Sequence, residues 1–180
     1  MQNFKDLYLE LCELLNTKVA AIKWLDLWNN QVDFLEEEYQ FPAPAVFLSF
    51  RFLDTTDFGT LAQNVSLQVD AYVFYETFAN TFKGSFNQDT ALEFLDLLNN
   101  VYAAIHGTSG TNYSNMRRTG LSALDTGGAG NLYQLNFECE LIDYAAIKNF
   151  VDADVDEVTV NNESAPEQEP ETGENFYLVN

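Results

Sequence analysis

The sequence predicts an α+β domain: an antiparallel or mixed β-sheet of about four or five strands, two helices packed on it and a long closing hairpin. Three patterns favour this fold class. Apolar residues recur at helical spacing near the start, residues 65–76 alternate between apolar and polar, and residues 117–144 contain two strand-like arms around a glycine-rich turn. At 180 residues, the chain has the length of one domain with a tail.

The first predicted element is an amphipathic helix of about four turns. Asn3 is placed to cap it, and Asp6 puts a carboxylate near the positive end of the helix dipole. Its apolar stripe has a spacing of three to four residues and consists of Phe4, Leu7, Leu11, Leu14 and Leu15. We predict that residues 19–28 then form a strand.

Two further strands are predicted before the second helix. Prolines at 42 and 44 cannot donate to a β-ladder, so they place the chain at the entrance of a strand over residues 45–53. We expect a loop at 54–59 before the clearest strand, residues 65–76. The alternation of that strand indicates an antiparallel sheet with one buried face, and Tyr72 indicates that the second face is covered near that end.

The second helix is expected to follow a long aromatic loop at 77–88. Asp89 is placed to cap this helix, and Gly107 is placed to end it. Its predicted stripe is Leu92, Leu95, Leu98, Tyr102 and Ile105. The closing hairpin has arms at 117–124 and 132–144. The predicted core comprises Leu7, Leu11, Leu14, Leu67, Val69, Val73, Leu95, Leu98, Leu135 and Phe137.

The charge distribution divides the chain into a domain, residues 1–150, and an acidic C-terminal extension, residues 151–180. The chain has 28 acidic and 8 basic residues, a formal net charge of −20. The extension holds nine of the acids and no Lys or Arg, which is typical of a flexible segment. Its apolar cluster is a candidate segment for docking to a partner and consists of Phe176, Tyr177, Leu178 and Val179.

This acidity excludes some classes of function. Affinity for nucleic acids depends on Lys and Arg that neutralise phosphates, so specific DNA binding is excluded, and anionic membranes are equally unsuitable partners. The first residues lack the basic and apolar segments of a signal peptide, and no apolar run approaches the roughly 20 residues that span a bilayer. We therefore expect an intracellular protein.

No catalytic, cofactor-binding or metal site is predicted, and we expect that the protein is not an enzyme. No serine or cysteine has a companion base at a recognisable spacing. His106, the only histidine, lies at a predicted helix end, where an interaction with the helix dipole is favoured over catalysis. Cys12 and Cys139 are interpreted as buried thiols. The carboxylate groups lack the spacing of a calcium loop and are interpreted as solvated surface.

Arg117 and Arg118 form the only basic pair of the sequence. Adjacent strand residues point to opposite faces of a sheet, so at most one of the two packs against its own sheet. Two interpretations stay open. The pair is either a solvated strand start or a candidate subunit interface that meets the carboxylates of a neighbouring molecule.

Three segments are similar to those of a known family. Residues 41–46, Phe-Pro-Ala-Pro-Ala-Val, look like its aromatic-Pro-x-Pro entry into a central strand. Residues 68–74 are similar to its alternating strand, and residues 124–128 with the strand that follows are similar to its closing hairpin. With the order of elements over residues 3–146, they resemble the tail-terminator and tail-completion proteins of long-tailed bacteriophages.

The resemblance implies a structural virion protein of the tail or of the head–tail connector, the neck. Proteins of this kind form a ring, expected to be a hexamer, that caps the tail tube and joins it to the head. The implied partners are other copies of the chain and the neighbouring tube and neck proteins. DNA would pass through an acidic lumen without specific binding, because its phosphates find no counter-charge there. Assembly would take place in the host cytoplasm.

Two alternatives from other classes remain open. The first is a small-molecule-binding or enzymatic α+β domain that uses the loop at 77–88 as a lid, for which a pocket with convergent polar groups is the discriminating observation. The second is an acidic inhibitor of a host protein, or a DNA mimic. Such a protein would be monomeric and would bind a basic partner in a salt-sensitive way.

Deletion of residues 151–180 is expected to leave the folding of residues 1–150 intact, because the extension has high charge and few core-forming residues. Thermal unfolding of the full-length and the shortened chain, followed by circular dichroism, measures this. A shortened chain without a cooperative transition would show that the domain continues past residue 150.

Overall fold

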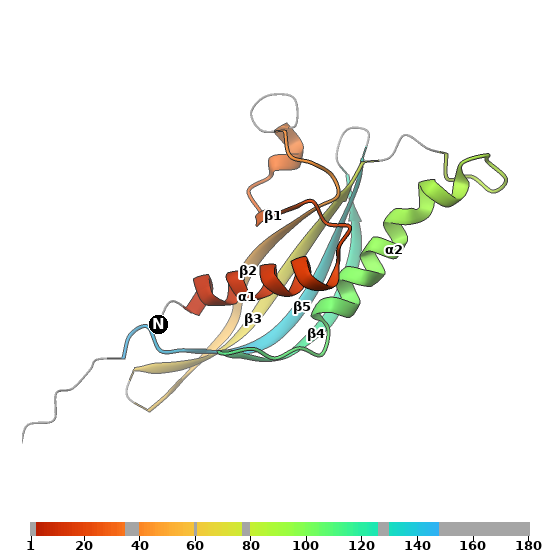
Figure 1. Cartoon of the computed structure of the whole chain (residues 1–180). Helices are drawn as coiled ribbons and strands as arrows, with labels where there is room; N and C mark the ends of the chain where they lie inside the picture. The colour runs from red at the N-terminus through yellow and green to blue at the C-terminus, as the bar shows by residue number, and fades with distance from the viewer. Residues whose placement is uncertain (1–2, 35–39, 60, 77–79, 126–129, 148–180) are drawn as a thin grey trace, which may run out of the picture. The chain divides into compact units, whose positions relative to one another are not determined.

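A five-stranded mixed sheet and two helices make up the fold of this computed structural model, which describes residues 3–34, 40–59, 61–76, 80–125 and 130–147 (Figure 1). The elements in chain order are α1 (Asn3–Lys18), β1 (Trp24–Leu27), the 3-10 helix η1 (Gln31–Phe34), β2 (Ala45–Phe58), β3 (Ala62–Tyr75), α2 (Gln88–Ile105), β4 (Tyr113–Leu124) and β5 (Asn131–Asp143). The strand order is β1-β2-β3-β5-β4, with β1 parallel to β2 and the other neighbours antiparallel. The predicted α+β class is confirmed.

The central strand β3 carries the alternation that was clearest in the sequence. One of its faces is apolar and fully or almost fully buried, and consists of Val65, Leu67, Val69, Ala71 and Val73. β2 and β5 pair with β3 on its two sides along nearly its whole length. β5 alternates in the same way, with Leu135, Phe137 and Leu141 buried. The result is one apolar sheet face that must be covered by other elements.

Both helices cover this face (Figure 1). Leu7, Leu11 and Leu15 of α1 are four residues apart, so they share one helix face, and all three are fully buried. They join the apolar face of the sheet and the buried side of α2 in one hydrophobic cluster. Burying a leucine side chain stabilises the fold by about 1.5–3 kcal/mol.

A second, smaller cluster lies on the opposite face of the sheet, at the end where β2 begins. It is built on Phe47 and Phe74, whose neighbours in the sequence belong to the first cluster. The Trp28 ring stacks on the Tyr72 ring with centroids 4.1 Å apart. The prediction that the second face is covered near Tyr72 is therefore confirmed.

The predicted buried face of α2 is partly wrong. Leu95 was placed in the core, but its side chain is 43% exposed. Leu98 and Ile105 are buried as predicted, and the other buried residues of the helix are Ala91, Phe94, Leu97, Val101 and Ala104. The buried face is rotated relative to the predicted stripe because Phe94 and Val101, which the stripe omitted, supply its bulk. In α1, Leu14 is half-buried at the edge of the core.

The predicted loop at 54–59 is also wrong up to residue 58. β2 continues to Phe58 and pairs with the start of β3, with a register irregularity between Phe52 and Asp54. Gly59 then has a positive φ of 58°, a conformation that glycine adopts without strain. The two aspartates suggested a loop, but on an exposed strand both carboxylates remain in water.

Other boundaries differ by smaller amounts. β1 contains only residues 24–27 of the predicted 19–28, and β4 begins at Tyr113, four residues before the predicted arm. Asn87, not Asp89, is the N-cap of α2, and Asp89 lies in the first turn. The glutamates at 36–38, the turn at 126–129 and the extension at 151–180 lie outside the described residues.

The burial difference on α2 gives a direct test. Leu98→Ala is expected to lower the free energy of unfolding by about 2–5 kcal/mol, because it removes a buried side chain and leaves a cavity. Leu95→Ala makes the same chemical change at an exposed position and is expected to cost less than about 1 kcal/mol. Urea unfolding of both variants measures the two values. Equal losses would contradict the orientation of α2.

Candidate functional site

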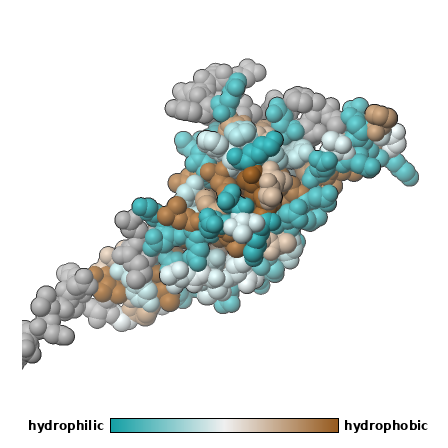
Figure 2. Space-filling view, in the orientation of Figure 1, coloured by the Kyte–Doolittle hydropathy of each residue, from teal (hydrophilic) through white to brown (hydrophobic). Residues whose placement is uncertain are grey.

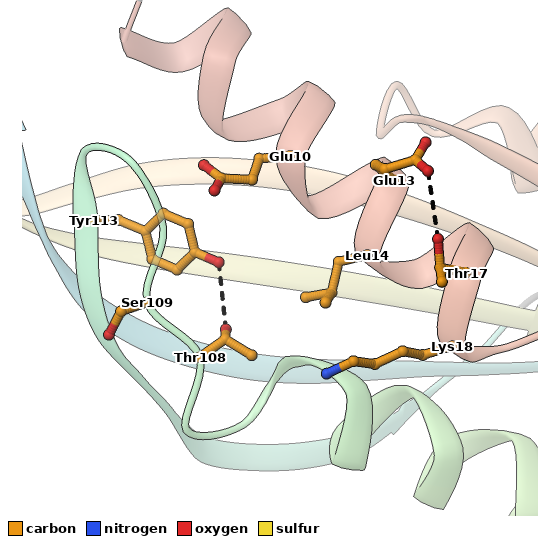
Figure 3. A pocket seen from close by; sticks show the side chains of 8 residues that line it. All are labelled: Glu10, Glu13, Leu14, Thr17, Lys18, Thr108, Ser109 and Tyr113. Carbon is orange, nitrogen blue, oxygen red and sulfur yellow. Dashed lines mark hydrogen bonds between the residues drawn. The ribbon is translucent and has the colours of Figure 1, made fainter.

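An open pocket lies between α1 and the segment that joins α2 to β4 (Figure 3). Its volume is about 580 Å³. The residues that line it are Glu10, Glu13, Leu14, Thr17, Lys18, Thr108, Ser109 and Tyr113. Gly110 permits the two sides to approach closely, because a Cβ at that position would lie only 2.6 Å from the carboxyl carbon of Glu10 on α1.

Several polar groups of the pocket hydrogen-bond within the chain. The Glu10 carboxylate accepts from the backbone N–H of Thr111 at 3.2 and 3.3 Å. The Tyr113 hydroxyl donates to Thr108 Oγ1 at 3.3 Å, and burial raises the pKa of this phenol. Within the described parts of the chain, no three His, Cys, Asp or Glu side chains gather closely enough to hold a metal ion. The arrangement suits the binding of a small molecule better than acid–base catalysis.

The histidine and the cysteines have structural surroundings. His106 Nδ1 accepts a hydrogen bond from the backbone N–H of Arg118 at 3.1 Å, so His106 ties the end of α2 to β4. Burial raises the pKa of the Cys139 thiol to about 12 and also raises that of half-buried Cys12. A thiol with a raised pKa is a poor nucleophile at neutral pH.

Arg117 and Arg118 point to opposite faces of β4, as expected for adjacent strand residues. The Arg118 guanidinium lies over the Tyr102 ring of α2, 3.7 Å from its centroid. The Arg117 side chain is 71% exposed, and its Nη2 lies 4.0 Å from Glu138 Oε2. Arg118 therefore packs on its own helix layer, while Arg117 is the arginine of the pair that another molecule can reach.

The sheet face opposite the helices carries a hydrogen-bonded polar group in its middle. Asp70 is only 7% exposed, and its Oδ1 accepts from Gln68 Nε2 at 2.7 Å and from Asn136 Nδ2 at 2.6 Å. Arg51 donates in turn to Gln68 Oε1. This group spans β2, β3 and β5, so it fixes their side chains in one row across the sheet.

The strongest surface feature is the β2–β3 arm, residues 51–66, whose tip extends past the part of the sheet that the helices cover (Figure 1). All described residues from 51 to 61 are exposed. Four of them are large apolar residues between 42% and 45% exposed: Phe52, Leu53, Phe58 and Leu61. Figure 2 shows apolar surface at this end of the sheet. Phe52 lies on the helix-covered face beside Phe4, and Phe58 lies on the other face beside Tyr144, so the arm exposes apolar side chains on both faces. Exposed apolar surface of this kind is typical of a protein–protein contact.

The two edges of the sheet differ in how far they are covered. β1 pairs with β2 only over residues 45–48, and the last bond there runs from the N–H of Trp28 to the carbonyl of Leu48 at 2.9 Å. Among the described residues, no strand pairs with the outer edge of β2 beyond this point. On the other side, Met116 of β4 exchanges hydrogen bonds with Gly107 and Thr108, so the first half of that edge is covered.

The structure describes only some of the site residues that were predicted from the sequence. Arg117 and Arg118 are described, but they do not form one site. Residues 176–179 and 77–79 lie outside the described residues. The exposed apolar arm was not predicted, because residues 54–59 were expected to be a loop. Thr55, Thr56 and Phe58 are residue types that favour strands, and they could have indicated that the strand continues past Asp54 and Asp57.

Comparison with models of known protein families and with curated proteins found no match to this chain. Neither α1 nor α2, the long helices of the described segments, combines the length and hydropathy of a membrane-spanning helix.

The two arginines are expected to differ in their contribution to stability. Arg118→Ala removes a cation–π contact on a half-buried side chain and is expected to cost about 1 kcal/mol of unfolding free energy. Arg117→Ala removes only an exposed ion pair and is expected to cost less than about 0.5 kcal/mol. Chemical denaturation of both variants at one salt concentration compares them, and the reverse order would contradict the placement of these side chains.

Proposed function

We propose that this chain is a structural subunit of an oligomeric ring at the head-proximal end of a phage tail or in the head–tail neck. The observation that carries the proposal is the exposed apolar β2–β3 arm, added to the resemblance of residues 3–146 to tail-terminator and tail-completion proteins. In a monomer, these four large apolar side chains each leave two fifths or more of their surface in water. In an assembly, the same side chains are buried against a neighbour and contribute to association.

The charge of the sheet supports passage of DNA beside this protein rather than binding to it. The sheet face opposite the helices carries four acids, Asp54, Asp70, Glu138 and Glu140, against two bases, Arg51 and Arg117. With the acidic excess of the whole chain, such a face repels phosphates. A lumen lined by acidic and uncharged polar groups would let a duplex slide.

A second candidate function rests on the α1 pocket. Its volume is within the range of small-molecule sites, and its lining includes Lys18 and Glu13 beside the apolar Leu14. The pocket favours a small-molecule-binding protein over an inhibitor of a host protein. If this function holds, a ligand found by thermal shift should lose its effect in Leu14→Trp, which fills the pocket, while Leu95→Trp on exposed α2 surface should leave binding unchanged.

The ring proposal is tested by asking whether the chain is part of the virion and what mass it has in solution. We expect peptides of this chain in purified particles by mass spectrometry, and an assembly near six times the chain mass by sedimentation equilibrium. Absence from purified particles rejects the proposal whatever the mass in solution.

Arg117→Glu is expected to weaken ring assembly while the subunit stays folded, because Arg117 is an exposed cation among carboxylates and is available to a neighbour. The loss should be largest at low salt, where screening is least. Lys83→Glu is the matched control, because it makes the same change of charge at an exposed position outside the sheet. Sedimentation of both variants at two salt concentrations tests this expectation. Equal assembly of the two variants would show that Arg117 is not in the interface.

A further inference from the structure

The outer edge of β2 between Ser49 and Phe58 is an unpaired strand edge within the described part of the chain. Its backbone N–H and C=O groups on that side are a template for another strand. Proteins usually protect such an edge with prolines, charged side chains, β-bulges or a covering segment. Residues 49–58 contain no proline and no lysine, and their middle is apolar; their protection is limited to the register irregularity between Phe52 and Asp54 and to three charged side chains.

The side chains along this edge are complementary to a second copy of themselves. Phe52 and Leu53 lie in the middle and are 42% and 44% exposed, with Arg51 directly before them and Asp54 directly after. In the antiparallel register that places Phe52 of one copy opposite Leu53 of the other, position 51 of each chain comes opposite position 54 of its partner. The dimer then contains two Arg51–Asp54 pairs, one on each side of an apolar centre.

The neighbours of these residues on β3 show that the two charges lie on one face of the sheet. Arg51 is paired with Gln68 and Asp54 with Ser66, and these two β3 residues are two positions apart. On the other face, the Phe4 ring of α1 stacks on the Phe52 ring with centroids 5.3 Å apart. Phe52 is thereby held in place, so less side-chain freedom is lost when it meets a partner.

We propose that two copies of the free chain pair through this edge, antiparallel and about a two-fold axis. Their two five-stranded sheets join into one sheet, with two Arg51–Asp54 pairs on one face. Phe52 and Leu53 of both copies meet at its centre. The contact is isologous, since both copies use the same patch, and it is complete with two copies.

The inference goes beyond the proposed ring. A ring that joins a tube to a head has two different faces, so a contact with two-fold symmetry across the sheet cannot build it. The pair is a form of the free chain. It covers the apolar centre of the arm until the subunit enters an assembly, and pairing competes with any ring contact that uses the same arm.

Charge exchange between positions 51 and 54 tests the pairing. Arg51→Glu places two acids opposite each other and Asp54→Arg places two bases, so each single variant should weaken the dimer by about tenfold or more. The double variant Arg51→Glu/Asp54→Arg restores opposite charges and should recover most of the affinity. An equimolar mixture of the two single variants should form the mixed dimer in preference to either homodimer, because both of its cross-strand pairs are then opposite in charge.

Sedimentation equilibrium of each protein and native mass spectrometry of the mixture measure these outcomes. Arg117→Glu, on the other edge strand, is the control and should leave the dimer unchanged. Arg51 also donates a hydrogen bond to Gln68 in its own chain, and the double variant lacks this bond as well as the single Arg51→Glu variant. Thermal unfolding of each variant measures what the loss of this bond costs the monomer. A monomeric wild type, or single and double variants with equal dissociation constants, would overturn the pairing.

The outcomes also separate this inference from the proposed function. Larger assemblies whose size is unaffected by the changes at 51 and 54, with no dimer at any concentration, reject the pairing and leave the ring proposal standing. A chain that forms the mixed dimer as expected but is absent from virions supports the pairing and rejects the ring.

Discussion

The pairing of β3 with both β2 and β5 is the interaction on which the rest of this structure depends. β3 lies in the middle of the sheet, and its buried face is completed by residues of both neighbours. The helices have little to bury without that surface, because α1 and α2 each present one apolar side. The pairing of β3 with β5 joins residues that are 56 to 80 positions apart, from Tyr75–Asn131 to Gln63–Asp143, which makes it costly in chain entropy and slow to form.

Asp70 restricts how β3 can pair. A carboxylate with little exposure needs hydrogen-bond donors, and here they come from Gln68 two residues away and from Asn136 directly opposite on β5. A slip of one residue between the strands would move Asn136 to the other face and leave Asp70 without that donor. The hydrogen bonds on the polar face thus stabilise one register of β3 with β5. That register in turn positions the apolar face under the helices.

Regular periodicity was the part of the fold that the sequence predicted well. Strands β3 and β5 alternate along most of their length, and Leu7 and Leu11 recur at one helical spacing, so the existence and type of these elements follow from local pattern. The buried face of α2 was harder to predict, because Leu95 and Phe94 are both apolar and only the packing of the helix on the sheet decides between them. The α1 pocket had no sequence signal, since its two sides are about 95 residues apart in the chain.

The β2–β3 arm shows a different limit of prediction from sequence. Sequence pattern distinguishes strands from loops by hydrophobicity, and two aspartates in five residues argued for a loop at 54–58. Pairing with β3 overrides that preference, because an edge strand that extends past the helices keeps its acidic side chains in water on both faces. The same extension leaves Phe52 and Leu53 partly exposed, although the Phe4 ring of α1 stacks on Phe52. A strand long enough to support β3 along its whole length is therefore also an exposed edge. The length that the fold requires of β2 and the exposed surface on which the proposed assembly depends therefore have one origin.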